Sequence, residues 1–531
     1  MPLLNIVGPD IDEYLQKTHE LLKDDDNFKG KHVGMPKYYH EDPDRDPDSV
    51  RGCFLDALYA DENFFQKLAD FFFDGDVPYA RENCHELNDA AMSEFLGQYE
   101  VDPGPRADRP YHVCFYGMSG YTASMVMEYL KRDVKDSVEI AFFGRSAAKV
   151  TALRDQILGG TKWETVECME ADLMNPNDVE RLVSSCRCVV NLAGPFVLSG
   201  GERLVEACVH YDTDYCDVSG EIPWNVKLME FHDVAWETGV YLVPSAAFAG
   251  GMPDLLSYVA VQKLQDERAE ATGKCHVYVQ MGGTATAPSG GTLMTRAAMM
   301  AARASSDEKT KKMMSDPFVL GGHIENGFRD EDQDEYLARV FHDKTINKWV
   351  SPHLYALYES RIVRRSNFLH HRLVGGPNKG KWYGLRFNFT AYVVQKNEIE
   401  ARKANGGGGR GGGEGGDLRK NKFYAPGDGP LLDDLIESEA YTCMHCVVES
   451  DDSDKRIKLS IKGYDAYYET ARMVVETSLT LALRSPELRT GKNHVRGGLL
   501  TPAIAGRKPL FERLLNSGLG FLDCETGKNL S

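Results

Sequence analysis

A glycine-rich turn between a short apolar run and an amphipathic stretch carries the clearest chemical signal in this chain. Residues Gly117 to Ala123 read G-M-S-G-Y-T-A, a spacing of G-x-x-G-x-x-A that is a variant of the dinucleotide-binding fingerprint. The first glycine allows a tight turn, the second lets the backbone approach a pyrophosphate, and the alanine keeps the following helix close to the sheet. Free N–H groups and the dipole at the start of that helix favour an anion. The alternative is an ordinary turn between a strand and a helix. We expect cofactor contacts from five residues of the turn: Gly117, Ser119, Gly120, Tyr121 and Thr122.

The residue after the second predicted strand indicates which dinucleotide binds. An NAD enzyme usually has Asp or Glu there, which binds the ribose 2′-hydroxyl, whereas this strand is followed by Arg145 and Ser146. A guanidinium cannot accept a hydrogen bond from a hydroxyl, but it pairs well with a 2′-phosphate. Arg145, aided by Ser146, therefore predicts NADP as the cofactor. The alternative is that Arg145 is a solvated surface residue.

Two more strand ends fit the same site, because open α/β sheets bind ligands at the carboxyl ends of their strands. Asp172 follows the third predicted strand, where its side chain can meet an adenine amino group. The competing role for Asp172 is a helix cap before Asn175. The fourth strand ends in a glycine-proline break on the expected nicotinamide side, and four residues there should line the site: Asn191, Ala193, Gly194 and Pro195.

Proton transfer beside the nicotinamide needs an acid, and two carboxyl groups follow the fifth predicted strand. Asp217 and Glu221 lie in the turn D-V-S-G-E, so both could face the cleft, where burial would raise the pKa of a carboxyl. We predict them as the catalytic candidates. In the alternative, Asp217 accepts from backbone N–H groups in the turn and Glu221 caps the next helix. Tyr121 and Tyr215 are alternative donors, although tyrosines in such domains usually pack.

Two other motifs have structural explanations that are at least as good as functional ones. The run from Ser289 to Thr292 could offer hydroxyl and backbone groups to an anion, but it also fits a helix N-cap. Cys443 and Cys446 form a single C-x-x-C with no second pair at zinc spacing, so we expect strand packing and no metal site.

Alternating strands and helices must position these side chains. Short apolar runs at 112–116, 138–143, 166–170, 188–192, 215–218 and 240–243 predict strands, and the stretches 120–132, 178–185, 201–211 and 225–238 predict helices. This alternation implies right-handed crossovers and a buried parallel sheet. The fold class is therefore α/β, with a Rossmann domain at residues 110–250.

The sequence outside residues 110–250 does not follow this alternation of short strands and helices. Residues 1–109 are acidic and read as a mostly helical extension. Residues 251–485 read as an α+β domain, since the runs 276–283, 384–395 and 446–463 look like longer antiparallel strands. Within it, the glycine-rich segment 405–417 predicts a flexible loop. The acidic run 449–454 predicts a solvated hairpin tip.

Composition limits the partners. The 531 residues include 61 Lys and Arg against 80 Asp and Glu, so the net charge of −19 argues against nucleic acid. The chain contains no stretch of about 18 uncharged apolar residues, so we do not expect a transmembrane helix. The 12 cysteines are thinly spread and the N-terminus does not resemble a secretory signal. We expect a cytoplasmic protein with a small-molecule substrate.

Several motifs in order resemble one family over about residues 111–525. The Rossmann segments 117–122, 143–146, 189–196 and 215–221 are joined downstream by 289–292, 426–430 and 497–503. Together they resemble the saccharopine dehydrogenase-like oxidoreductases, which include trans-acting enoyl reductases of complex-lipid synthesis. The resemblance implies an NADP-type Rossmann domain, a second domain with a mainly antiparallel sheet that serves substrate binding and dimerisation, and a C-terminal segment, 486–531, that returns to the first domain.

The resemblance also implies function. It predicts hydride transfer to or from a C=N, C=O or C=C bond of a lipid-related metabolite, a homodimer, and peripheral contact with membranes or lipid droplets. By family analogy, the alternative locations to the cytoplasm are the lipid droplet and the mitochondrion.

Departures from the family pattern keep a second function open. Family members commonly read G-F-D-S-I-P after the last Rossmann strand, whereas residues 247–254 read A-F-A-G-G-M-P-D and lack that aspartate. Residues 340–425 are polar where some members have an apolar stretch. These two differences bear on substrate identity and membrane contact. The missing aspartate and the long acidic N-terminal arm keep open the alternative of a non-catalytic NADP-binding sensor or scaffold. Saccharopine dehydrogenase activity itself would need an arginine cluster that the sequence does not reveal.

Overall fold

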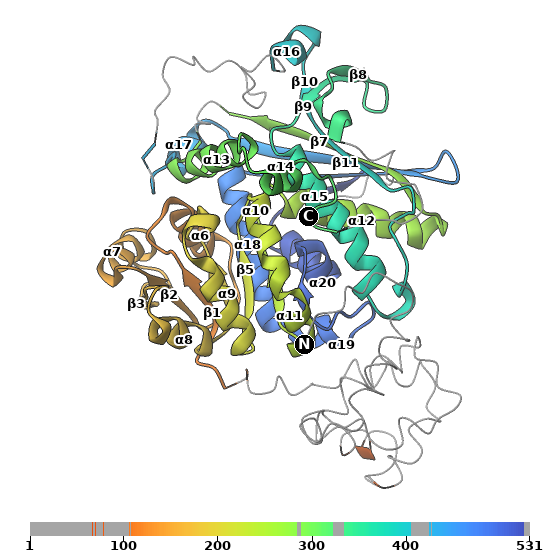
Figure 1. The fold of residues 1–531 in the computed structure, drawn as a ribbon. Coiled ribbons are helices and arrows are strands. Elements are labelled where there is room, and N and C mark those ends of the chain that lie inside the picture. The colour runs from red at the N-terminus through yellow and green to blue at the C-terminus, as the bar shows by residue number, and fades with distance from the viewer. Residues whose placement is uncertain are drawn as a thin grey trace. The chain divides into compact units, whose positions relative to one another are not determined.

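The computed structural model describes residues 106, 108–283, 288–321, 334–404, 424–425 and 427–524, together with four isolated positions, 66, 69, 70 and 78. The chain divides into the units Met1–Asp102 and Pro103–Ser531, and the fold below belongs to the second (Figure 1). The helical extension predicted for residues 1–109 lies almost wholly outside the described residues. The glycine-rich loop predicted at 405–417 lies outside them entirely.

The first sheet is the parallel sheet predicted from the sequence. Its seven strands follow the order β13-β6-β5-β4-β1-β2-β3, and every pairing is parallel. The chain winds outward from β1 to β3 and then returns to the other side of β1, so the topology switches between β1 and β4, where such sheets bind nucleotides. The strands are β1 (Tyr111–Tyr116), β2 (Ile140–Gly144), β3 (Glu167–Glu170), β4 (Cys186–Asn191), β5 (Asp214–Asp217), β6 (Tyr241–Val243) and β13 (Gly498–Leu499).

Helices bury both faces of this sheet, as continuous apolar strands require. Along β1, Val113 and Phe115 point into one hydrophobic cluster, and Cys114 and Tyr116 point into the other. The first cluster includes α6 (Tyr121–Arg132), α7 (Ala147–Leu158), α18 (Ala466–Leu483) and α20 (Pro502–Asn516). The second includes α8 (Pro176–Ser184), α9 (Gly201–His210), α10 (Ile222–Leu228) and α11 (His232–Thr238).

The second sheet is mixed and mainly antiparallel. Its strand order is β14-β12-β11-β7-β10-β9-β8, and only the β7–β10 pair is parallel. Helices α12 (Gly251–Arg268) and α15 (Ala356–Leu373) pack on its inner face. The strands are β7 (Thr272–Gly282), β8 (Phe341–Asp343), β9 (Lys348–Pro352), β10 (Asn388–Gln395), β11 (Tyr441–Ser450), β12 (Arg456–Gly463) and β14 (Gly520–Asp523).

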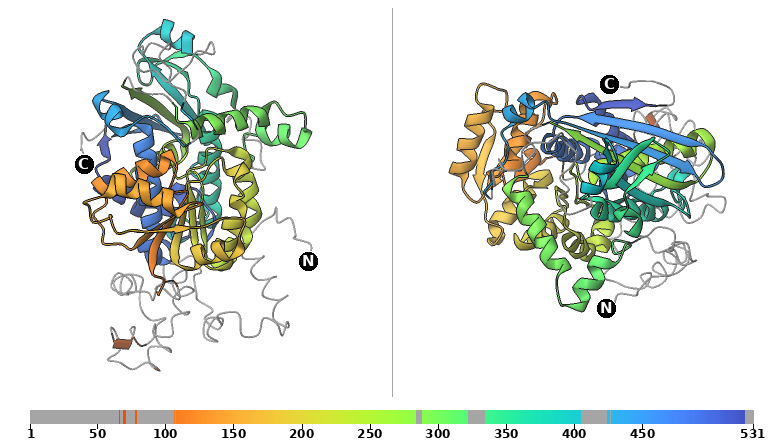
Figure 2. Two further views of the ribbon diagram at one scale, coloured as in Figure 1. Left: turned by 90° about the vertical axis from the view of Figure 1, so that its left-hand side faces the viewer. Right: turned by 90° about the horizontal axis from the view of Figure 1, so that it is seen from above.

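Helix α18 connects the two sheets. It follows β12 of the second sheet and packs against β1, β4 and β5 of the first, so it runs from one sheet toward the other (Figures 1 and 2). Helix α13 (Gly290–Arg303) lies between the second sheet and the helices of the first (Figure 1). The other α-helices of this region are α14 (Glu308–Ser315), α16 (Glu398–Lys403), α17 (Leu432–Glu437) and α19 (Ser485–Thr490).

The six predicted Rossmann strands all exist, and their bounds agree to within two residues. The acidic run 449–454 forms the turn of the β11–β12 hairpin, as predicted. Four strands were missed, namely β8, β9, β13 and β14. Each has only two to five residues, too few for a strand period to stand out in the sequence.

Within the described residues, no helix is both long enough and apolar enough to span a membrane.

Candidate nucleotide site and adjoining cleft

The predicted glycine turn lies at the switch point and contacts the loop after β4. Gly117 has φ of 88°, a conformation that L side chains rarely adopt. A Cβ atom at this position would lie 2.9 Å from the backbone nitrogen of Ala193 and 3.0 Å from the carbonyl carbon of Leu192. Only glycine therefore allows the two loops to approach this closely, and the turn sits where a dinucleotide would cross the sheet.

The first turn of α6 fits a pyrophosphate. Gly120 is its N-cap, no side chain caps the helix, and the first turn carries no acidic residue. Ser119 is exposed and Thr122 is half-buried beside this end. Tyr121 is different: its ring is buried, and its hydroxyl donates to the carbonyl oxygen of Pro430 at 2.9 Å. Tyr121 can therefore offer its backbone to a ligand, while its side chain anchors the 427–430 segment.

The ends of the first three strands converge as predicted. Tyr116 ends β1, and burial raises the pKa of its phenol, while Arg145 lowers that pKa and Asp172 raises it. Both charged groups therefore lie within electrostatic reach of the same hydroxyl. Arg145 is exposed, so its guanidinium is accessible to a phosphate.

Ser146 and Asp172 also have local structural roles. Ser146 caps α7, because its hydroxyl accepts from the backbone N–H of Lys149 at 3.4 Å. Asp172 accepts from the backbone N–H of Met174 at 2.9 Å, whereas Asn175 is the cap of α8. Asn175, and not Asp172, is therefore the residue that caps α8.

A buried hydrogen-bond chain links the ends of β4 and β5. Asn191 accepts from the N–H of Ala193 at 3.0 Å and donates to the hydroxyl of Tyr215 at 3.2 Å. Tyr215 in turn donates to Asp217 at 2.9 Å. Asn191 and Asp217 are fully buried. The chain fixes the backbone that leads into Gly194 and Pro195, so Asn191 acts on the predicted nicotinamide side through the loop that it holds.

Asp217 is surrounded by donors. Besides Tyr215, it accepts from the indole N–H of Trp224 at 2.7 Å and from the backbone N–H groups of Ser219 and Ser245 at 2.9 and 3.0 Å. Burial raises the pKa of Asp217, and these donors oppose that rise. This geometry matches the structural alternative considered for Asp217, in which it satisfies backbone N–H groups.

Glu221 holds the loop after β4. Its two carboxylate oxygens accept from the backbone N–H groups of Phe196 and Val197 at 3.0 and 3.1 Å, and Thr295 donates to it at 3.3 Å. Burial raises the pKa of Glu221, and the N–H groups partly lower it. Glu221 stands at the N-cap position of α10 but makes no side-chain cap bond there, so the capping alternative does not describe it.

Helix α13 contacts the start of α18 and Glu221. Ser289 caps it by accepting from the N–H of Thr292 at 3.3 Å, as the N-cap alternative predicted. Tyr467, at the start of α18, accepts from the N–H of Ser289 at 2.7 Å and lies 3.0 Å from the hydroxyl of Thr292. The ring of Tyr467 packs edge-on against Tyr121, with centroids 5.0 Å apart. The N-termini of α6, α13 and α18 therefore meet beside the glycine turn.

The segment that departs from the family pattern leads into α12. Asp254 near its start is fully buried and accepts from the N–H of Ala503 at 2.9 Å and from the hydroxyl of Ser366. Burial raises the pKa of Asp254 to about 7. This carboxyl ties α12 to α15 and α20 and lies in the core.

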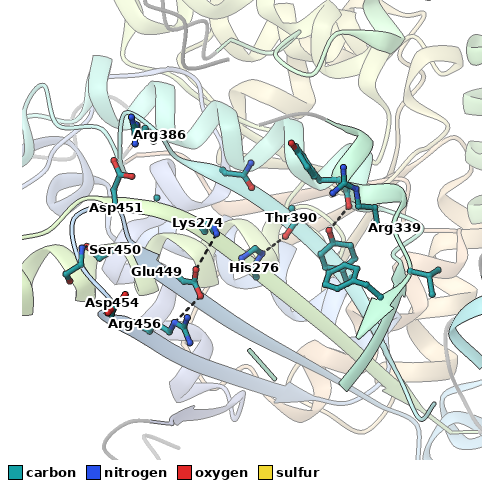
Figure 3. Close-up of a pocket in the computed structure, with 17 residues that line it drawn as sticks. Lys274, His276, Arg339, Arg386, Thr390, Glu449, Ser450, Asp451, Asp454 and Arg456 are labelled. Atoms are coloured by element: carbon teal, nitrogen blue, oxygen red, sulfur yellow. Dashed lines mark hydrogen bonds and ion pairs between the residues drawn. The ribbon is translucent and has the colours of Figure 1, made fainter. Parts of the chain in front are cut away.

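A cavity of about 780 Å³ lies away from the glycine turn, on the outer face of the second sheet (Figure 3). Lys274 and Arg456 both pair with Glu449 there, at 3.9 and 3.0 Å, and His276 bonds Thr390 at 2.6 Å. Because residues alternate along a strand, this face is opposite the one that α12 covers. The cavity is not part of the nucleotide site.

The C-x-x-C motif packs as expected. Cys446 is buried in the core 3.8 Å from Cys275, while Cys443 lies half-buried 3.5 Å from His445. Residues three apart on a strand point to opposite faces, so the two cysteines of the motif cannot meet.

The amino-acid sequence is similar to those of known proteins over most of its length. No protein-family model matches the chain. A Mycobacterium tuberculosis protein provisionally named a trans-acting enoyl reductase is 27% identical over 432 residues, covering 77% of this chain and 97% of the relative. The trans-acting enoyl reductase of Mycobacterium ulcerans is 26% identical over 439 residues, covering 78% and 97%. Over most of its length, the chain is thus similar to trans-acting enoyl reductases.

This relationship confirms the resemblance that the sequence motifs predict. Among solved structures, saccharopine dehydrogenase (L-Glu forming) from Saccharomyces cerevisiae matches with a TM-score of 0.42 and 14% identity, covering 77% of this chain and 99% of that one. The site residues of this chain stay predictions, because their assignment rests on sequence and geometry alone.

Sequence reasoning did not single out two side chains that contact the region of the glycine turn. These are Thr295 on α13, which donates to Glu221, and Tyr467 on α18, which packs on Tyr121; neither belongs to a recognisable motif. The local signal nearby was the Ser289–Thr292 cap, which placed the start of α13 correctly. Which side chains of α13 contact Glu221 and Tyr467 depends on how that helix packs.

Proposed function

We propose that this protein is an NADP(H)-dependent oxidoreductase that reduces or oxidises a C=C, C=O or C=N bond of a lipid-related metabolite. The observation that carries the proposal is the pairing of an uncapped α6 N-terminus behind Gly117 with an exposed Arg145 at the end of β2. The first fits a pyrophosphate and the second fits a 2′-phosphate. The name of the relatives favours a C=C bond among the three.

The residues present fit the cofactor. Gly117, Ser119, Gly120 and the backbone of Tyr121 and Thr122 would hold the pyrophosphate, Arg145 and Ser146 the 2′-phosphate, and Asp172 the adenine. The residues on the nicotinamide side would be Asn191, Ala193, Gly194 and Pro195. When bound, the cofactor supplies or accepts the hydride.

Asp217 and Glu221 position that side of the cleft in this proposal. Both carboxyl groups accept hydrogen bonds from N–H or O–H donors through both oxygens. Each carboxylate oxygen already accepts from at least one donor, which favours the ionised form and a role in orienting the loops after β4 and β5. A catalytic role for either acid stays a prediction.

Cofactor titration of the purified full-length chain tests the proposal. We expect NADPH to bind more tightly than NADH in calorimetry. Arg145→Ala should weaken NADPH binding by about tenfold or more, since a charge-assisted bond to phosphate is lost, and should change NADH binding little. Arg132→Ala, which removes an equal charge at the far end of α6, is the matched control. Absence of binding to either form of the cofactor would contradict the proposal.

The second candidate is a non-catalytic NADP-binding sensor or scaffold associated with lipid metabolism. It is favoured by Ala249, which stands where the family commonly has an aspartate, and by the hydrogen bonds that both oxygens of each predicted acid accept. Oxidation of NADPH, followed at 340 nm with α,β-unsaturated acyl, carbonyl and imine compounds, separates the candidates. Binding of NADPH without turnover of any of these compounds would favour the sensor. The homodimer and the contact with membranes or lipid droplets stay predictions.

A further inference from the structure

A short segment before α17 packs on the first residue of α6. It comprises residues 428–430, part of the motif at 426–430 to which the proposed function assigns no role. The hydroxyl of Tyr121 donates to the carbonyl oxygen of Pro430 at 2.9 Å, and both residues are buried. Tyr121 directly follows Gly120, the N-cap of α6, so the segment is attached to the turn that is proposed to hold the pyrophosphate.

The contact leaves no space for a side chain at Gly429. A Cβ atom there would lie 2.5 Å from Cε2 and 2.6 Å from Cδ2 of the Tyr121 ring. The ring cannot easily yield, because Tyr467 packs edge-on against it with centroids 5.0 Å apart and because its hydroxyl is bonded to Pro430. The absence of a side chain at Gly429 therefore sets how closely the segment approaches α6.

The same segment is also bonded to α13. The backbone N–H of Gly290, the first residue of that helix, donates to the carbonyl oxygen of Asp428 at 3.0 Å. Further along α13, Thr295 donates to Glu221, which holds the loop that follows Pro195 on the expected nicotinamide side. The segment thus joins the start of α6 to the helix that reaches the nicotinamide side.

We propose that segment 428–430 forms a wall of the site for the nicotinamide half of the cofactor, and that Tyr121 and Gly429 are the positioning residues that hold this wall against α6. Backbone packed beside the α6 N-terminus excludes water there, and hydrogen bonds from N–H groups to a pyrophosphate are stronger where water is excluded. A wall that is in place before the ligand arrives also lowers the entropy cost of binding. The inference rests on the proposed function and extends the cofactor site to segment 428–430.

Two ligands that share the adenosine half test the inference. NADPH has both halves of the dinucleotide, whereas 2′,5′-ADP has the adenine, the 2′-phosphate and a 5′-phosphate but lacks the nicotinamide half. Both are titrated calorimetrically into the full-length protein and its variants. Gly429→Ala pushes the segment away from Tyr121, and Tyr121→Phe removes the bond to Pro430. Gly518→Ala is the control, because Gly518 has φ of 91° and a Cβ atom there meets nothing within 4 Å, so this variant strains the backbone without displacing a neighbour.

We expect Gly429→Ala to weaken NADPH binding by at least about fivefold and to change the affinity for 2′,5′-ADP by less than about twofold. Tyr121→Phe should weaken NADPH binding with the same selectivity by about two- to tenfold, which is the loss expected for one hydrogen bond. Gly518→Ala should alter neither affinity. If the segment served folding alone, Gly429→Ala would lower the urea midpoint and leave the ratio of the two affinities unchanged.

The inference is overturned if the folded Gly429→Ala and Tyr121→Phe proteins bind NADPH as tightly as the unaltered protein does, or if both ligands weaken equally. If Gly429→Ala does not fold, Tyr121→Phe alone decides between these outcomes. The proposed function fails by a different result, namely no binding of NADPH to the unaltered protein.

Discussion

The contact between the turn after β1 and the loop after β4 makes a sharp prediction for Gly117→Ala. The new methyl group would lie 2.9 Å from the backbone nitrogen of Ala193, inside the 3.4 Å at which ordinary contact begins. Its neighbours are backbone atoms, which cannot rotate away as a side chain can. The loop after β4 would therefore have to move by about 0.5 Å, or the turn would have to open.

Gly160→Ala provides a matched control for this substitution. Gly160 also has positive φ, 75°, but a Cβ atom there meets nothing within 4 Å. Both variants carry the strain of a left-handed alanine, about 1–2 kcal/mol, partly offset by a less flexible unfolded chain. Only Gly117→Ala adds overpacking, about 1–3 kcal/mol. We expect losses in the free energy of unfolding of about 2–4 kcal/mol for Gly117→Ala and about 1 kcal/mol or less for Gly160→Ala.

Urea denaturation and NADPH titration measure the two consequences. The midpoint of Gly117→Ala should fall well below that of Gly160→Ala, and its affinity for NADPH should drop by about tenfold or more, since the moved loop lies in the nucleotide crevice. Gly160→Ala should bind NADPH as the unaltered protein does. If both variants unfold at the same urea concentration and bind NADPH equally, the close approach of the two loops has no energetic role and the reasoning is wrong.

Two buried carboxyl groups give further predictions. Glu221→Gln replaces one acceptor oxygen by an NH2 group that faces a backbone N–H of the Phe196–Val197 loop, so the free energy of unfolding, measured in urea, should fall by about 1–3 kcal/mol. The control Glu206→Gln, at an exposed position, should change the free energy of unfolding little. Equal urea midpoints for the two variants would contradict the role assigned to Glu221. Burial raises the pKa of Asp254 from 3.8 to about 7, so the folded state holds this proton more tightly than the unfolded chain does. The contribution of Asp254 to the free energy of unfolding is therefore complete below about pH 4 and is lost as the pH rises through 7. The difference in free energy of unfolding between the unaltered protein and Asp254→Asn should therefore decline by up to about 4 kcal/mol between pH 4 and pH 7 and stay constant above pH 7. If the free energies of unfolding of the two proteins change with pH in parallel, this account is wrong.

Local signals in the sequence were enough for six of the seven strands of the first sheet and for the glycine turn of the candidate nucleotide site. Most of the predicted strands are buried apolar runs next to a stretch of helical periodicity, which makes them recognisable; β3, with two glutamates, is the exception. The spacing of its glycines identifies the glycine turn. The cap at Ser289 and the hairpin at 449–454 were also readable, since caps and turns depend on a few adjacent residues. Short edge strands such as β8 were not, because three residues contain too little periodicity.

The roles of the buried acids needed the fold. In the sequence, Asp217 and Glu221 are two carboxyl groups in one turn, and proton transfer and backbone anchoring are equally compatible with that spacing. The structure brings donors to them from residues that are distant in sequence, such as Ser245 and Thr295. Whether a carboxyl is free or fully bonded is a property of its neighbours in space, and sequence spacing does not encode these.

The amino-acid sequence by itself determined the parallel sheet, the glycine turn, the arginine that follows β2 and the family resemblance, because each depends on residues that are close along the chain. Tertiary structure alone decided that the loops after β1 and β4 touch, that the Asp217 carboxylate accepts four hydrogen bonds and that the Glu221 carboxylate accepts three. Those facts depend on how segments that are distant along the chain pack together, and packing is set by many weak contacts.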